Sequence, residues 1–233
     1  STEKRRMRLT NGKDEHLEIW EHIGALRYTG LAGVVVSIED TDSGFPPYHG
    51  RAHEIWDAVR NHCEDTGERL PRYNLLSTLQ FGYPNQPDGK ERYTRMEPAS
   101  SDQFSIRVIL DYPGLGKWDE TFRLPNERVL EEILRARTQG WPRWLKPVSK
   151  TASLFGWPHD KCIRWKDWNE SAETVLHEYA MHRAQDILGA MSLVCHDGTF
   201  RANVISFRSG HLADANLVKK ANSALSKTVL SSS

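Results

Sequence analysis

The clearest alternation of apolar and polar residues lies in the middle of the chain. From Phe104 to Tyr112 every second residue is apolar, which predicts a half-buried strand. A Pro113-Gly114 turn follows, so residues 120–124 can return antiparallel. Apolar residues then recur at helical spacing over about 127–138, and Asn126 stands where it can cap that helix. The pattern therefore predicts a hairpin followed by a helix.

Four further segments have apolar residues at helical spacing. They cover residues 15–28, 51–66, 170–189 and 213–229. Asn169 precedes the third of them and is the residue expected to cap it.

Two apolar runs and one turn signal predict additional strands. Residues 31–38 form the most β-like run, and residues 75–81 can form another strand. Asp197-Gly198 separates the β-rich residues 193–196 from 199–207, and such a pair favours a two-residue hairpin turn. Helices and antiparallel hairpins are mixed without regular βαβ alternation. The expected fold is α+β around one core, with an irregular Trp-rich segment.

A net charge of zero conceals two basic regions. The chain has 31 Lys and Arg against 31 Asp and Glu. Residues 1–13, the basic arm, hold five cations and one acid, and little that could be buried. Residues 135–168, the Trp-rich segment, hold eight cations, two acids and five of the eight tryptophans. We expect a mobile basic arm over 1–13 and a single domain over 14–233, with a possible subdivision near 140–168.

Basic residues interleaved with aromatic ones favour a polyanionic partner. Bases of single-stranded nucleic acid stack on aromatic rings, and an anionic membrane surface attracts the same residue types. The candidate polyanion-binding residues are Arg5, Arg6, Arg8, Arg135, Arg137, Arg143, Trp144, Lys146, Lys150, Trp157, Lys161, Arg164 and Trp165. The alternative is that the tryptophans fill a loop-rich core while the cations face solvent.

An acidic cluster follows the β-like run 31–38. Glu39, Asp40 and Asp42 are weak candidates for catalysis, because carboxylates beyond a buried strand can hold Mg²⁺ for phosphoester chemistry. The alternative is a turn rich in Asp and Ser ahead of Pro46-Pro47.

The histidines give no convincing metal motif. His177-Glu178 and His182 are similar to a zincin box, but the two histidines are five residues apart. On a helix their rings would point about 140° apart, so they cannot share an ion. Phosphate-binding and nucleophile-elbow motifs are absent from the sequence. The sequence therefore predicts neither a metal site nor a cofactor.

The favoured function is a non-enzymatic, cytoplasmic binding protein for nucleic acid, or less favourably for an anionic membrane. A viral or phage nucleoprotein or matrix-type protein would fit this description, and a homo-oligomer is possible. One alternative is a metal-dependent phosphoesterase or nuclease that uses the acidic cluster, and another is a protein–protein adaptor. The sequence shows neither a transmembrane segment nor a secretory signal.

Overall fold

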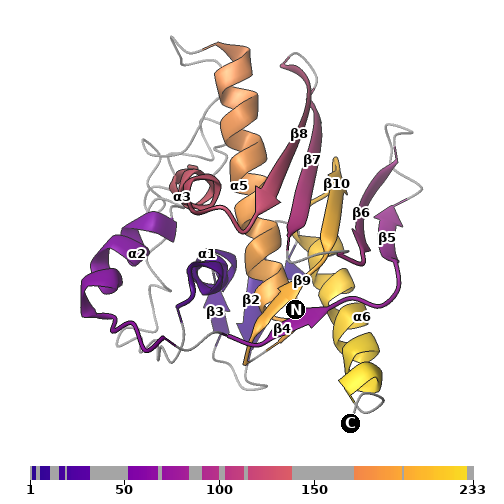
Figure 1. The fold of residues 1–233 in the computed structure, drawn as a ribbon. Helices are drawn as coiled ribbons and strands as arrows, with labels where there is room; N and C mark the ends of the chain where they lie inside the picture. The colour runs from indigo at the N-terminus through magenta and orange to yellow at the C-terminus, as the bar shows by residue number, and fades with distance from the viewer. Residues whose placement is uncertain are drawn as a thin grey trace.

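A computed structural model describes residues 2–3, 6–10, 16–18, 20–31, 52–67, 70–83, 91–99, 103–112, 115–137, 171–195 and 197–229 (Figure 1). The described helices are α1 (Trp20–Ala25), α2 (Ala52–Val59), α3 (Glu127–Arg135), α5 (Ala172–Ser192) and α6 (His211–Val229), with 3-10 turns at η1 (Leu26–Thr29) and η3 (Arg60–His62). The described strands are β1 (Thr2–Glu3), β2 (Arg6–Thr10), β3 (His16–Glu18), β4 (Arg72–Asn74), β5 (Leu79–Tyr83), β6 (Arg92–Glu97), β7 (Phe104–Tyr112), β8 (Gly116–Leu124), β9 (Thr199–Arg201) and β10 (Asn203–Phe207).

A five-stranded mixed sheet forms the centre of the fold. Its strand order is β5-β6-β10-β7-β8, with β10 parallel to β7 and antiparallel to β6. Smaller sheets are formed by β1-β2-β3 and by β4 with β9. Helix α5 packs between β7 and β8 on one side and α1 and α3 on the other (Figure 1). The α+β prediction is confirmed.

The hairpin of β7 and β8 agrees with the apolar alternation. Phe104, Ile106 and Val108 are buried on one face of β7. Arg107 lies on the opposite, exposed face, where its Nε and Nη2 donate to the carboxylate of Asp119 on β8 at 2.8 and 2.5 Å. Successive side chains of β7 therefore point alternately to the core and to solvent. For this reason the alternation in the sequence was enough to predict the strand.

The helices after this hairpin begin at polar caps. The backbone N–H of Val129 donates to Oδ1 of Asn126 at 3.1 Å, which confirms the predicted cap of α3. The cap predicted for the long helix was wrong: α5 is capped by Ser171, whose hydroxyl accepts from the N–H of Thr174. The predicted C-terminal helix is confirmed as α6, which begins two residues early, at His211.

The predicted hairpin at Asp197-Gly198 was wrong. Strand β9 pairs in parallel with β4, while β10 enters the central sheet. Asp197 accepts from the hydroxyl of Tyr73, and Gly198 lies against Pro71 so closely that a Cβ would stand 2.3 Å from its carbonyl oxygen. The glycine permits two distant segments to touch, which local turn statistics do not reveal.

The N-terminal region also differs from the helix predicted over 15–28. That range contains strand β3 before α1, and η1 follows α1. Strand β2 lies within the range of the predicted basic arm and pairs with β3. The domain boundary at residue 13 stays a prediction.

Several predicted features lie outside the described residues. They are most of the β-like run 31–38, the acidic cluster Glu39, Asp40 and Asp42, and residues 138–168 of the Trp-rich segment. Within the described ranges, no helix combines the length and apolar character needed to cross a membrane.

The contact at Gly198 predicts a specific sensitivity to a methyl group. We expect Gly198→Ala to lower the free energy of unfolding by about 1–3 kcal/mol, because its Cβ would collide with the Pro71 backbone. Gly210→Ala is the control, since a Cβ there meets nothing within 4 Å. Chemical denaturation measures both variants, and equal losses would contradict the proposed steric cause.

Candidate metal centre

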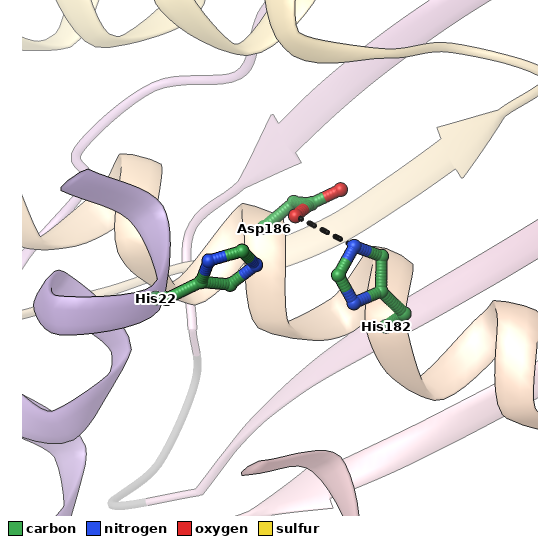
Figure 2. A group of neighbouring side chains, drawn as sticks. All are labelled: His22, His182 and Asp186. Atoms are coloured by element: carbon green, nitrogen blue, oxygen red, sulfur yellow. Dashed lines mark ion pairs between the residues drawn. The ribbon is translucent and has the colours of Figure 1, made fainter. Parts of the chain in front are cut away.

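Three potential metal ligands from two distant parts of the chain meet beside α5. His22 comes from α1, and His182 and Asp186 come from α5 (Figure 2). One ligand atom from each residue lies within 4.8 Å of the others. His182 and Asp186 are four residues apart, so their side chains leave the helix only about 40° apart. The helical spacing and the contact of α1 with α5 therefore build the cluster together.

The cluster is buried and leaves polar atoms without partners. His22, His182 and Asp186 are 8%, 5% and 5% exposed. Nε2 of His182 lies 3.5 Å from Oδ1 of Asp186. A dashed line marks this ion pair in Figure 2. Within the described part of the chain, Nδ1 of each histidine and Oδ1 of Asp186 have no hydrogen-bond partner. Buried groups of this kind are costly unless something satisfies them.

These residues fit a divalent metal ion of the zinc type. Zn²⁺ binds imidazole nitrogen and carboxylate oxygen, and catalytic zinc sites use three protein ligands and keep a fourth position for water or substrate. Two histidines and one aspartate are such a set. The donor atoms and their burial agree with an ion held inside the protein, away from bulk solvent.

Burial keeps both histidines neutral. Burial first, and then the neighbouring His182, lower the pKa of His22 from 6.5 to about 3. Burial also lowers the pKa of His182, against the opposing effect of Asp186. Burial alone would raise the pKa of Asp186, but its neighbours, among them the permanently charged Arg183, hold that pKa below its usual value. The site therefore offers neutral imidazoles and an ionised carboxylate, the protonation states that bind metal.

Gln185 ties the elements around the cluster together. With its amide nitrogen turned toward α3, it donates to the carbonyls of Ile133 and Leu134 at 3.0 and 3.3 Å. Its amide oxygen then accepts from Nε2 of His22 at 3.1 Å. A fully buried amide thus joins α1, α3 and α5 at the level of the ligands.

A third histidine reaches the edge of the cluster from α6. Nε2 of His211 lies 3.9 Å from Oδ2 of Asp186. Its side chain is 23% exposed, whereas the side chains of His182 and Asp186 are each 7% exposed. His211 is therefore placed between the buried ligands and the outside of the molecule.

The structure places few of the sequence-predicted site residues near one another. Arg135 donates to Glu131 one turn earlier in α3, and Arg137 makes a two-pronged ion pair with Glu178 on α5. Arg6 and Arg8 lie in β2. The other candidates, Arg5, Arg143, Trp144, Lys146, Lys150, Trp157, Lys161, Arg164, Trp165, Glu39, Asp40 and Asp42, lie outside the described residues.

Sequence reasoning missed the metal cluster because it looked for ligands within one motif. It compared His182 with His177, which instead contacts Glu120 through Nδ1 at 2.8 Å. The useful signal was His182 with Asp186, two potential metal ligands spaced four residues apart, so that they share one face of the predicted helix. His22 lies 160 positions before His182, and no local spacing connects them.

Comparisons with known proteins point to one enzyme family. The family model LpxC, described as UDP-3-O-acyl N-acetylglycosamine deacetylase, matches residues 1–222. A UDP-3-O-acyl-N-acetylglucosamine deacetylase of Sulfurovum sp. is 26% identical over 133 residues, which are 56% of this chain and 45% of the relative. Proteins of the same name from Nautilia profundicola and Syntrophus aciditrophicus are 24% and 21% identical, over 56% and 85% of this chain and 44% and 62% of the relatives. The chain spans about half the length of these two curated relatives from Sulfurovum sp. and Nautilia profundicola.

These matches overturn the favoured interpretation of the sequence. The prediction of a non-enzymatic protein that binds nucleic acid or an anionic membrane, possibly of viral origin, was wrong. The matching family model and relatives are named as deacetylases, with a UDP-linked sugar as the named reactant. Charge counts along the sequence could not show that Arg135 and Arg137 have carboxylate partners in the fold.

Because buried His22 resists protonation, stability of the metal-free protein should depend on pH. Its pKa is about 3 when folded and near 6.5 when unfolded, so the unfolded chain binds more protons between these values. The free energy of unfolding should be fully present above about pH 6.5 and fall by about 1.4 kcal/mol per pH unit below it from His22 alone.

Chemical denaturation of chelator-treated protein between pH 7 and 4 measures this dependence. His22→Phe keeps a buried ring but removes its titration, so its stability should fall less steeply with acid. Identical slopes for the two proteins would contradict the pKa assigned to His22.

Proposed function

The chain belongs to the LpxC family of UDP-3-O-acyl N-acetylglycosamine deacetylases, and on that premise we propose that it is a metal-dependent amide hydrolase. Its proposed substrate is a UDP-linked, 3-O-acylated N-acetyl amino sugar, from which it removes the acetyl group. The observation that carries this proposal is the buried cluster of His22, His182 and Asp186, whose ligand atoms lie within 4.8 Å of one another.

The reaction is hydrolysis of an amide. Water adds to the acetyl carbonyl carbon, the carbon–nitrogen bond breaks, and acetate and a free amino sugar leave. A metal ion bound at the cluster would supply Lewis-acid chemistry for attack by water. The nitrogen that leaves needs a proton, so the site also requires a group that can deliver one.

The protein residues have separate tasks in this proposal. His22 and His182 stay neutral at physiological pH, since burial lowers the pKa of both, and their ring nitrogens can bind metal without first losing a proton. Ionised Asp186 adds one negative charge, which partly neutralises a divalent ion. The low exposure of the three side chains excludes water around them, which strengthens their electrostatic interaction with the ion.

His211 is placed to carry the proton. Its ring lies at the edge of the cluster, 3.9 Å from Asp186, and remains partly exposed. Histidine titrates nearer to neutral pH than other side chains, which suits it to give a proton to the departing amine. We propose that His211 acts as the general acid, beside the metal ligands.

The family and its named relatives supply the substrate in this proposal. The identity of the sugar and of its acyl chain come from the names of the family and of relatives that are longer than this chain. The cytoplasmic location also stays a prediction.

The proposal predicts that metal and activity are lost together. We expect about one zinc-type ion per chain, and release of acetate from UDP-3-O-acyl-N-acetylglucosamine. His182→Gln should reduce both, because it removes one of three ligands. His177→Gln is the matched control: it lies on the same helix but faces Glu120, and it should keep both metal and activity.

Elemental analysis and an acetate-release assay measure the two quantities. A metal-loaded wild-type protein that releases no acetate would overturn the proposed function. So would full activity after complete removal of metal by a chelator.

A further inference from the structure

A buried ion pair beside the metal cluster has no part in the function proposed so far. Arg183 follows the ligand His182 on α5, and Asp214 lies in the first turn of α6. The side chains are 6% and 1% exposed. Arg183 donates through Nη1 to Oδ2 of Asp214 at 2.5 Å and through Nη2 to Oδ1 at 2.6 Å. This two-pronged contact fixes the direction as well as the distance between α5 and α6.

The remaining donors of Arg183 reach the segment that leads into α6. Its Nε donates to the hydroxyl of Ser206 at the end of β10 at 3.0 Å, and Nη2 also donates to Ser209 at 3.1 Å. The two serine hydroxyls are 3.0 Å apart, and that of Ser209 lies 2.5 Å from the hydroxyl of buried Thr94 on β6. The guanidinium is thus hydrogen-bonded on both sides of His211 in the sequence, to Ser206 and Ser209 before it and to Asp214 after it.

The backbone between these contacts is a tight turn. Arg208 adopts a positive φ of 49°, and its N–H donates to the carbonyl of Ile109 on β7 at 3.0 Å. The N–H groups of Ala213 and Asp214 donate to the carbonyl of Gly210 at 2.9 and 3.4 Å. His211, the first residue of α6, therefore lies between residues on either side that one side chain from α5 contacts.

We propose that Arg183 and Asp214 are positioning residues that hold His211 at the edge of the metal centre. The effect on catalysis rests on the proposed function. The effect on the position of His211 rests only on the hydrogen bonds of Arg183 to Asp214, Ser206 and Ser209. Arg183 is not placed to bind substrate, because it is nearly inaccessible and its donors already meet Asp214, Ser206 and Ser209. Since α5 also carries His182 and Asp186, the ion pair fixes His211 relative to the metal ligands.

A packing role and a positioning role can be separated by conservative variants. Arg183→Lys keeps the positive charge, but an ammonium group cannot make the two parallel hydrogen bonds of the guanidinium. Asp214→Asn keeps the shape of the side chain but loses its negative charge. Glu178→Gln is the matched control, because it weakens another ion pair on α5, with Arg137, one turn before His182. The double variant Arg183→Met/Asp214→Leu removes both charges, so no unpaired buried charge prevents folding.

The first measurement is hydrogen exchange, which needs no substrate. The amides of Ala213 and Asp214 should exchange at least about tenfold faster in the Arg183 and Asp214 variants, with the Leu130 amide in α3 as internal reference. Glu178→Gln should leave the ratio unchanged. Equal exchange in wild type, Asp214→Asn and the double variant would overturn the inference.

The second measurement separates turnover from binding. In Arg183→Lys and Asp214→Asn, kcat for acetate release should fall by on the order of 10–100-fold. KM and the affinity for Co²⁺, measured by absorption, should stay within about threefold. An unchanged kcat, or a kcat that falls only in proportion to the fraction of folded protein, would overturn the inference.

The two measurements also separate this inference from the proposed function. A wild-type protein that binds Co²⁺ but releases no acetate would refute the proposed function, while hydrogen exchange would still decide whether the ion pair holds the turn. If the wild type is active and the Arg183→Lys and Asp214→Asn variants match it in both measurements, the inference is refuted and the proposed function stands.

Discussion

The burial of polar groups along one stretch of α5 is the constraint on which the surrounding structure depends. His182, Arg183, Gln185 and Asp186 are consecutive or nearly so, and each is at most 5% exposed. A helix satisfies its own backbone, but these side chains need partners from elsewhere, because an unpaired buried charge costs several kcal/mol. The partners come from α1, α3 and α6, so the same residues decide where those helices sit.

This arrangement explains why the cluster is suited to an ion. Arg183 and Gln185 have protein partners for their donors, whereas His22, His182 and Asp186 keep polar atoms that no described residue satisfies. A metal ion would meet that requirement, and binding it would add to the free energy of unfolding because the unfolded chain lacks the site. Such an ion would thus contribute to stability, and it would tie α1, which carries His22, to α5, which carries His182 and Asp186.

The sequence predicted those parts of the fold whose cause is local. The β7–β8 hairpin follows from two-residue alternation, and α3 follows from helical spacing with a cap at Asn126. Asp197-Gly198 was wrongly predicted to be a hairpin turn. Glycine is needed there because the backbone comes close to Pro71, which belongs to a distant segment. The sequence failed to predict the metal centre for the same reason, a contact between distant segments. His182 and Asp186 share a recognisable spacing, but His22 joins them only when α1 packs on α5.

The misread function has a related physical origin. Counting cations and aromatic residues in a segment treats each charge as available to a partner outside the protein. Two of the counted cations, Arg135 and Arg137, instead pair with carboxylates of α3 and α5. Conversely, the two histidines and one aspartate of the metal cluster do not form a charged segment, because His22 lies far from the other two in the sequence. A polar residue predicted to be buried in a helix is therefore a stronger indicator of a functional site than a local charge count. Burying it is costly unless a partner or a ligand compensates.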